Sequence, residues 1–169
     1  VVYLRFITFD HIFNTPILIV VNKSQSFMEI KWVDTHCHLQ LLNKNLDENH
    51  FKNIEFLVIP GVDVESSSKA KEISSSLEVE SYWSAGLHPH DAKLLDTQRH
   101  DLEKLFVEAD LIGETGLDFY RNLSTKEQQR ENFLFHLEFS KQLNKPIIIH
   151  CRDSFQDTYD LLVEFNNPS

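Results

Sequence analysis

The segment Leu111-Ile-Gly-Glu-Thr-Gly-Leu-Asp-Phe-Tyr-Arg121 places one carboxylate, Glu114, between two glycines at the end of a short apolar run. Such a run predicts a buried strand that emerges into a loop. Segments that carry histidines lie on both sides of it in the sequence. They are Asp34-Thr-His-Cys-His38, Gly86-Leu-His-Pro-His90 and Ile147-Ile-Ile-His-Cys-Arg-Asp153. One glutamate among so many histidines indicates a metal site.

Short apolar runs alternate with charged stretches of helical periodicity from Met28 onward. The predicted strands are Trp32–His36, Ile54–Gly61, Tyr82–His88, Leu111–Thr115 and Pro146–His150. The predicted helices are Val64–Leu77, Gln98–Glu108, one capped by Ser124 and Glu127 that runs to Asn144, and one opened by Ser154 and Asp157 that reaches Phe165. Buried strands that alternate with helices predict parallel βαβ units.

The candidate site residues share one position, the C-terminal end of a predicted strand. They are His36, His38, His88, Glu114 and His150. This end is the catalytic face of a (β/α)8 barrel and also the ligand face of an open doubly wound sheet. About five βα units are present, so a barrel would be roughly three units short.

The composition limits the classes of partner. Acidic residues outnumber basic ones by 26 to 16, and the net charge of −10 argues against binding nucleic acid through a basic surface. A nucleic-acid enzyme is not excluded, because bound divalent cations add local positive charge. The two cysteines lie far apart in the sequence, so a disulfide framework is not expected and a reducing compartment fits better.

Residues 1–27 differ from the rest of the chain. Their apolar run, Ile17–Val21, is too short to span a bilayer, and no secretory signal pattern is present. The only methionine is Met28. We therefore predict that the natural start is Met28 and that residues 28–169 form the domain. Residues 1–27 would then be an extension that arises from upstream translation or an artefact. Mass spectrometry of the native N-terminus tests this prediction.

His36 and His38 are two residues apart, so on an extended strand both rings point to the same side. Two such imidazoles are a common metal-binding device, although an isolated pair is more often two ordinary polar residues. Glu114 has two oxygens and can hold one metal with each, with the two metals about 3.5 to 4 Å apart. The alternative for Glu114 is a salt bridge to Arg121 or Arg152.

Other polar residues around these segments have weaker patterns. A rigid apolar strand delivers His150, which is either a metal ligand or a satisfied core histidine. Arg152 suits a substrate phosphate or, equally, a carboxylate partner. His88 and His90 flank Pro89 and suit substrate orientation or proton transfer better than joint coordination. Asp118 is predicted to be a loop or cap residue that pairs with Arg121.

The cysteines are not predicted to bind metal. Cys37 and Cys151 each follow a histidine directly. Neighbours on a strand face opposite sides, so the cysteines point away from the side that the histidines occupy.

Taken together, the four motifs resemble those of the TatD family of metal-dependent deoxyribonucleases, which are amidohydrolase-like barrel hydrolases. The similarity runs from Trp32 to Phe165. It implies a (β/α)8 TIM barrel truncated to about five βα units. It also implies two divalent metal ions, Mg, Zn or Mn, with His36 and His38 on the first, Glu114 bridging as the catalytic carboxylate, and His150 on the second. His88 and Arg152 would then contact substrate.

The resemblance also implies a function. The expected reaction is hydrolysis of DNA phosphodiesters through a metal-activated water, exonucleolytic on single-stranded ends. The enzyme is expected to be cytoplasmic, or alternatively nuclear, to be monomeric when full-length, and to need no membrane. The family's later histidine and aspartate have no counterpart before Ser169. Two alternatives stay open: an ester or amide hydrolase such as an aminoacyl-tRNA deacylase, and an inactive truncated fragment. The coding sequence beyond Ser169 separates the second alternative from the enzyme.

Overall fold

The computed structural model describes residues 30–42 and 47–166. Within these ranges, five parallel strands form one sheet in the order β1-β2-β3-β4-β5. Their bounds are β1 Trp32–Asp34, β2 Ile54–Pro60, β3 Glu80–Ala85, β4 Leu111–Asp118 and β5 Ile147–Arg152. Each strand therefore pairs with the next one in the chain. The prediction for residues 1–27 lies outside the described residues.

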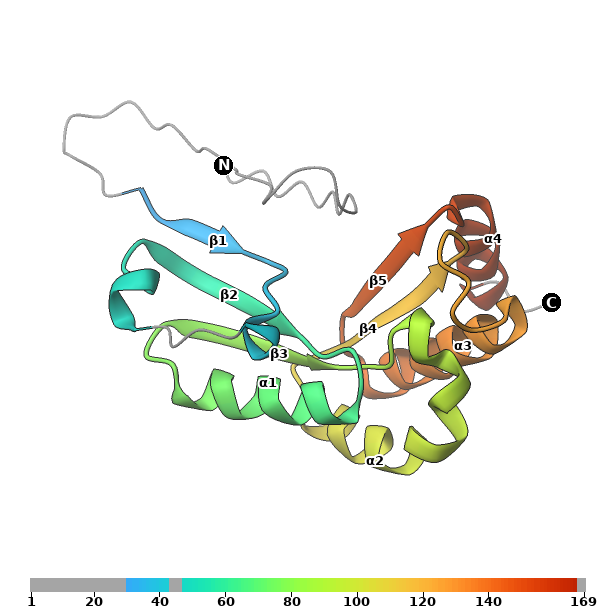
Figure 1. Cartoon of the computed structure of the whole chain (residues 1–169), viewed down its shortest axis with the longest axis horizontal. Helices are drawn as coiled ribbons and strands as arrows, with labels where there is room; N and C mark the ends of the chain where they lie inside the picture. Colours follow the sequence, from blue (N-terminus) through green and yellow to red (C-terminus); the bar gives the residue numbers. More distant parts are fainter. Residues whose placement is uncertain (1–29, 43–46, 167–169) are drawn as a thin grey trace.

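The sheet is curled, and the helices gather on its convex side (Figure 1). The α-helices are α1 Val64–Ser76, α2 Leu95–Glu108, α3 Lys126–Leu143 and α4 Phe155–Asn166. Short 3-10 helices are η1 Leu39–Leu41, η2 Glu48–Phe51 and η3 Pro89–Leu94. Sequential parallel strands that alternate with helices are the first part of a (β/α)8 barrel, so the predicted truncated barrel is confirmed. None of the described helices is long and apolar enough to cross a membrane.

The main core lies between the sheet and helices α1, α2 and α3. It is contributed by buried side chains of the strands and helices, including Leu57, Ile59, Trp83, Ile112, Leu102, Phe106 and Phe135. A second cluster joins β4 to α3 and α4 and contains Leu117, Phe133, Leu137 and Leu161. These clusters fix the helices against the sheet, and burial of this apolar area is the main favourable term in folding.

The strand ends differ from the predicted ones. β1 stops at Asp34, two residues before His36, because the Asp34 carboxylate accepts the His36 backbone N–H at 3.1 Å and turns the chain. β3 likewise stops at Ala85, before His88. In contrast, β4 and β5 continue past the predicted ends to Asp118 and Arg152. Glu114 and His150 therefore lie within strands. His36, His38 and His88 lie in the connections after β1 and β3, and His90 lies in η3.

The start of α3 also differs. Its N-cap is Thr125, which forms a capping box with Gln128, so the predicted box of Ser124 and Glu127 is wrong by one residue. The Ser124 hydroxyl instead donates to the His90 carbonyl at 2.9 Å and ties the loop before α3 to η3. α3 ends near Asn144, as predicted, where Asn144 adopts the left-handed conformation with φ of 51°.

Gly116 allows β4 and β5 to approach closely. Its φ is +140°, and a Cβ built on it would lie 2.1 Å from the backbone oxygen of His150. Only glycine adopts this backbone region without strain. The close pairing of Gly116 with His150 in turn sets the position of the His150 ring beside Glu114.

Gly116→Ala is expected to lower the free energy of unfolding by at least about 2 kcal/mol, because it adds backbone strain and a clash with the neighbouring strand. Urea titration followed by circular dichroism measures the change. Ser75→Ala, on the exposed surface of α1, is the control and should change stability by less than about 0.5 kcal/mol. An unchanged midpoint for Gly116→Ala would contradict the close approach.

Candidate metal centre

Glu114 lies in the middle of β4 and is 6% exposed. Its backbone N–H donates to the Gly61 carbonyl at 2.8 Å, which ties β4 to the end of β2. The two carboxylate oxygens face different histidines. Oε2 faces His36 and His38, and Oε1 faces His150.

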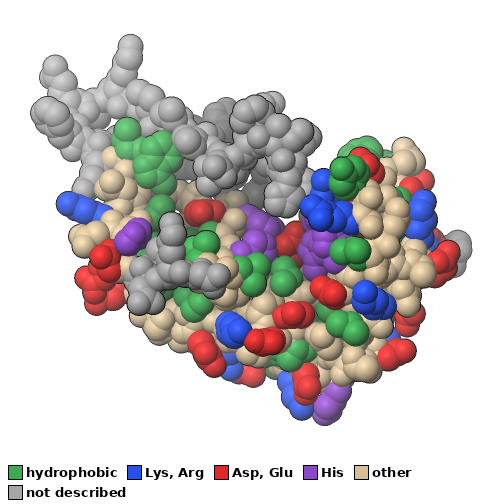
Figure 2. All heavy atoms as spheres, viewed as in Figure 1, with side chains coloured by type: hydrophobic (Ala, Val, Ile, Leu, Met, Phe, Trp, Pro, Cys, Tyr) green, Lys and Arg blue, Asp and Glu red, His purple; other side chains and the backbone are tan. Residues whose placement is uncertain are grey.

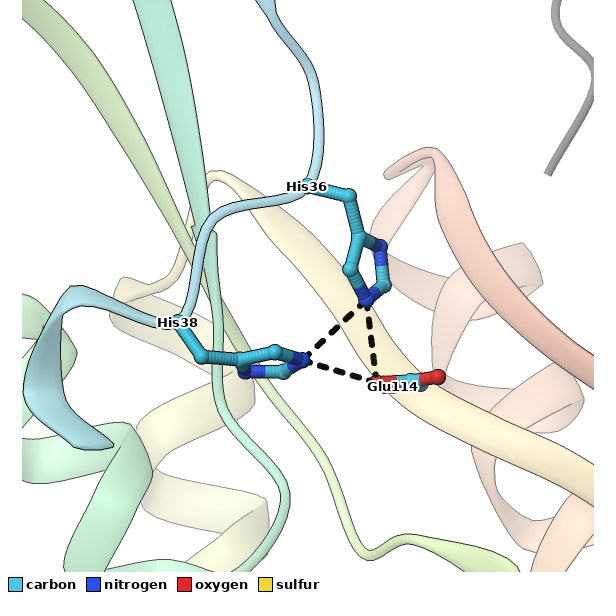
Figure 3. A group of neighbouring side chains, drawn as sticks. All are labelled: His36, His38 and Glu114. Carbon is cyan, nitrogen blue, oxygen red and sulfur yellow. Dashed lines mark hydrogen bonds and ion pairs between the residues drawn. The ribbon is translucent and has the colours of Figure 1, made fainter. Parts of the chain in front are cut away.

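The first cluster consists of His36, His38 and Glu114 (Figure 3). Glu114 Oε2 lies 3.3 Å from His36 Nε2 and 3.4 Å from His38 Nε2, and the two nitrogens are 3.1 Å apart. A tetrahedral ion with bonds of about 2.0 to 2.1 Å requires ligand atoms about 3.3 Å apart. The three atoms thus have the spacing of one face of a metal coordination sphere, and imidazole with carboxylate is a donor set for zinc, manganese or similar ions.

A neighbouring carbonyl orients the His38 ring for this task. His38 Nδ1 donates to the Pro60 carbonyl at 3.0 Å, because a carbonyl oxygen can only accept. The neutral ring therefore has its lone pair on Nε2, the atom that faces Glu114. A hydrogen bond from the remote nitrogen to a carbonyl is the usual support of a metal-binding histidine.

The second cluster consists of His88, Glu114 and His150. His150 Nδ1 lies 3.1 Å from Glu114 Oε1 and 3.1 Å from His88 Nε2, while His88 Nε2 and Glu114 Oε1 are 3.9 Å apart. These atoms are also close enough to share one ion. Glu114 belongs to both clusters and contributes a different oxygen to each.

His88 has the geometry of a hydrogen-bond donor. Its Nδ1 accepts the His90 backbone N–H at 3.2 Å, so the neutral ring carries its hydrogen on Nε2, which points into the cluster. Burial lowers the pKa of His88 to about 3, so the ring is neutral near pH 7. A nitrogen that bears hydrogen cannot ligate a metal, which favours the predicted substrate contact over the coordination that the distances alone would allow.

Opposing effects act on the charge of the first cluster. Burial raises the pKa of Glu114, but the close contacts with the imidazoles of His150, His36 and His38 outweigh it and hold this pKa well below its ordinary value. For His36, burial lowers the pKa, and the contact with Glu114 raises it above the ordinary value. The carboxylate is therefore ionised and surrounded by nitrogen ligands, as a metal-binding carboxylate must be.

Asp118 is a functional candidate that the sequence analysis treated as a loop or cap residue, and it contacts His90, which was predicted with His88 to orient substrate or transfer a proton. Asp118 is fully buried, and its Oδ2 lies 2.7 Å from His90 Nε2 and 3.1 Å from His150 Nε2. The predicted pairing with Arg121 occurs only through the Arg121 backbone N–H. Asp118 lies four residues after Glu114, a spacing that puts both on one face of a strand, so strand periodicity would have found it had the strand been drawn to its true end.

Arg152 and Tyr120 lie next to the cluster at the ends of β5 and β4. The Arg152 guanidinium lies 4.0 Å from the centroid of the Tyr120 ring, and Tyr120 is 61% exposed. Figure 2 shows histidines in a hollow of this face, with basic side chains beside them. Neither the predicted salt bridge of Glu114 to Arg121 nor that to Arg152 is among the ion pairs of Glu114 in the described part of the chain.

The cysteines do not join either cluster in the described part of the chain. The Cys37 thiol donates to the Val58 carbonyl at 3.1 Å, and burial raises its pKa to about 12. Cys151 lies 3.6 Å from the Ser154 hydroxyl. The raised pKa keeps the Cys37 thiol protonated, so it lacks the character of a metal-binding thiolate.

Two buried residues of α3 hold the loop that carries His88. Asn132 Nδ2 donates to the Leu87 carbonyl at 2.7 Å, and the Leu87 N–H donates to His136 Nε2 at 3.0 Å. His136 Nδ1 donates in turn to the Asn132 carbonyl at 2.7 Å. Both backbone polar groups of Leu87 are satisfied, which fixes the residue directly before His88.

The family model for TatD-related DNases matches residues 33–169. The chain belongs to the TatD-related DNase family. Among relatives of this family, an uncharacterized metal-dependent hydrolase of Buchnera aphidicola is 33% identical over 150 residues, covering 80% of this chain and 55% of that protein. The 3'-5' ssDNA/RNA exonuclease TatD of Escherichia coli K12 is 36% identical over 110 residues, covering 63% of this chain and 42% of that protein.

Solved structures of the TatD family share the fold. The Escherichia coli K12 TatD homologue YJJV superposes with a TM-score of 0.73 at 21% identity, covering 83% of this chain and 58% of that one. A TatD family hydrolase of Entamoeba histolytica gives a TM-score of 0.67 at 19% identity, covering 82% and 56%. The chain spans about half the length of the relatives that it matches. The comparisons thus show the family and the fold, and relatives of this family are named metal-dependent hydrolases. The activity of this protein and the ligand roles of its individual residues are predictions.

We expect His136 to make stability depend on pH. Burial lowers its pKa to about 4, so between about pH 6.5 and pH 4 the unfolded chain binds a proton that the folded chain does not. The contribution of the neutral His136 ring to the free energy of unfolding is complete above about pH 6.5. It decreases as the pH is lowered from about 6.5 to 4, by at most about 1.4 kcal/mol per pH unit. His136→Gln, which keeps an acceptor and a donor, should reduce this slope relative to the parent in urea unfolding. Equal slopes would contradict a neutral buried ring.

Proposed function

We propose that the protein containing this chain is a two-metal phosphodiesterase that hydrolyses single-stranded nucleic acid, DNA in particular, from an end. The observation that supports it best is the sharing of Glu114 between two clusters of nitrogen ligands, one oxygen to each. Two ions held about 3.5 to 4 Å apart by one carboxylate suit the attacking and leaving oxygens of a phosphoryl displacement. The name of the Escherichia coli relative, a 3'-5' ssDNA/RNA exonuclease, points to the same substrate class.

The residues of this chain have distinct roles in the proposal. His36, His38 and Glu114 would hold the first ion, and Glu114 with His150 would hold the second. Bound metals, whether Mg, Zn or Mn, supply Lewis acidity and lower the pKa of a bound water. The low exposure of Glu114 keeps bulk water from competing for its oxygens.

The substrate contacts come from the rim. The Nε2–H of His88 points into the second cluster, where it can donate to a phosphoryl oxygen. The Arg152 guanidinium suits phosphate, and the exposed Tyr120 ring beside it suits stacking with a terminal base. A grip through two ions, one arginine and one ring is compatible with a net charge of −10. The proposal places the enzyme in the cytoplasm, as a monomer when full-length.

In the full-length protein that carries this chain, Glu114→Ala should lower the rate of single-stranded DNA hydrolysis more than about 100-fold. Substitution of residues that only support metal ligands already lowers metal affinity or activity by about 10- to 100-fold, and Glu114 is itself a proposed ligand. Release of nucleotides from an end-labelled oligonucleotide, with and without chelator, measures the rate. Glu138→Ala removes an exposed carboxylate on α3 and is the control. Activity within a few-fold of the parent would refute the bridging role of Glu114.

The same preparation distinguishes phosphodiesterase from acyl hydrolase. An aminoacyl-tRNA or another acyl ester should be cleaved far more slowly than single-stranded DNA. Faster cleavage of the acyl ester would favour the deacylase alternative, and no chelator-sensitive activity on either substrate would favour an inactive protein.

Tyr120→Ala is expected to raise KM for a single-stranded oligonucleotide by about 10-fold, because stacking of one base contributes about 1 to 3 kcal/mol. Hydrolysis of a small phosphodiester that lacks a base should be unchanged. Tyr159→Ala removes an exposed tyrosine on α4 that is 55% exposed, and it serves as the matched control. An equal effect on both substrates would show that the ring acts on the site itself and not on the base.

A further inference from the structure

We propose that Asp118 is a positioning residue that selects the nitrogen with which His150 binds metal. The Asp118 carboxylate holds the His150 hydrogen on Nε2, so that the lone pair of Nδ1 faces Glu114. This inference deepens the proposed function, because it rests on the second cluster being a metal position.

The orientation of the Asp118 carboxylate is fixed by the backbone. Its Oδ1 accepts the backbone N–H groups of Tyr120 at 3.0 Å and Arg121 at 2.9 Å. Its Oδ2 is thereby directed to the histidines, 2.7 Å from His90 Nε2 and 3.1 Å from His150 Nε2. Each oxygen faces two N–H positions, which fills the four acceptor sites of the carboxylate and leaves none for a metal ion.

The backbone of Asp118 is also held on both sides. Its N–H donates to Gln129 Oε1 at 2.7 Å, and Gln129 Nε2 donates back to its carbonyl at 3.0 Å. Gln129 itself is fully buried on α3, and Asp118 pairs with Arg152 in the β4–β5 ladder. The carboxylate therefore cannot turn away from His150 without breaking these contacts.

The consequence for His150 follows from the chemistry of the two groups. Both ring nitrogens face an ionised carboxylate, Nε2 that of Asp118 and Nδ1 that of Glu114. The His88 Nε2–H lies 3.1 Å from Nδ1 and donates to it, so Nδ1 is the acceptor and the neutral ring carries its hydrogen on Nε2, toward Asp118. Nδ1 then bears the lone pair, 3.1 Å from Glu114 Oε1. A carboxylate that orients a metal-binding imidazole in this way fixes its tautomer and raises its basicity.

Asp118→Asn tests the assignment sharply. The two backbone N–H groups must keep the amide oxygen at the Oδ1 position, so the amide NH2 takes the Oδ2 position and donates toward His150 Nε2. The ring then moves its hydrogen to Nδ1, which can no longer bind metal. The first cluster contains neither Asp118 nor His150 and should be unaffected.

The experiment uses the complete 169-residue chain and Zn²⁺ alone. Calorimetric titration of the parent should show two sites, and Asp118→Asn should weaken one of them by about 10- to 100-fold and leave the other within about 2-fold. Long-range 1H–15N NMR of the imidazoles should show His150 protonated on Nε2 in the parent and on Nδ1 in the variant. Asp101→Asn, on the exposed surface of α2, removes the same charge and should change neither readout.

Two results would overturn the proposal. One is a parent chain whose His150 carries its hydrogen on Nδ1, a measurement that does not depend on any variant folding. The other is a folded Asp118→Asn variant with the parent's tautomer and zinc affinities. Neither readout involves nucleic acid, so a failure of the nuclease proposal on DNA would leave this result standing, and the reverse also holds.

Discussion

The structure depends on one buried carboxylate that faces histidines on both sides. Removing Glu114 from water is unfavourable, and only the imidazoles around it hold its pKa low. The imidazoles that hold this pKa low come from two separate segments, after β1 and within β5, and His88 approaches the carboxylate from the connection after β3. The carboxylate is therefore the point at which distant parts of the sheet meet, and these contacts explain how an acidic side chain can occupy the middle of the buried strand β4.

The parallel sheet makes this meeting possible. In a parallel sheet all strands present their C-terminal ends at one edge, so loops that are far apart in the sequence converge there. The close pairing of Gly116 with His150 and the clamp of Asn132 and His136 on Leu87 refine the positions of individual rings. Around the proposed ligands, the carbonyl of Pro60 contacts His38 and the carboxylate of Asp118 contacts His150. In the proposed site, affinity for metal would therefore depend also on residues that do not bind the ions.

The sequence predicted the fold class and the four residues His36, His38, Glu114 and His150 that the structure brings together. Apolar periodicity and the resemblance of the motifs were sufficient for this, because parallel strands place their ends predictably. The local turn at Asp34 was not predicted, since it depends on a side chain that bonds the backbone N–H of His36. The cap of α3 was misplaced by one residue because Ser124 and Thr125 both suit an N-cap, and a tertiary bond to His90 decides between them.

Asp118 was predicted as a loop or cap residue because the predicted strand ended at Thr115, whereas β4 runs to Asp118. Its contacts with His90 and His150, 28 and 32 residues away in the sequence, depend on the tertiary fold. In the proposed site, Glu114 contributes one oxygen to each of two ions. Anomalous diffraction from a crystal of the chain soaked in Mn²⁺ or Zn²⁺ tests it most directly. Two peaks about 3.5 to 4 Å apart, one at each oxygen of Glu114, are the expected result. A single peak, or peaks away from Glu114, would contradict the account.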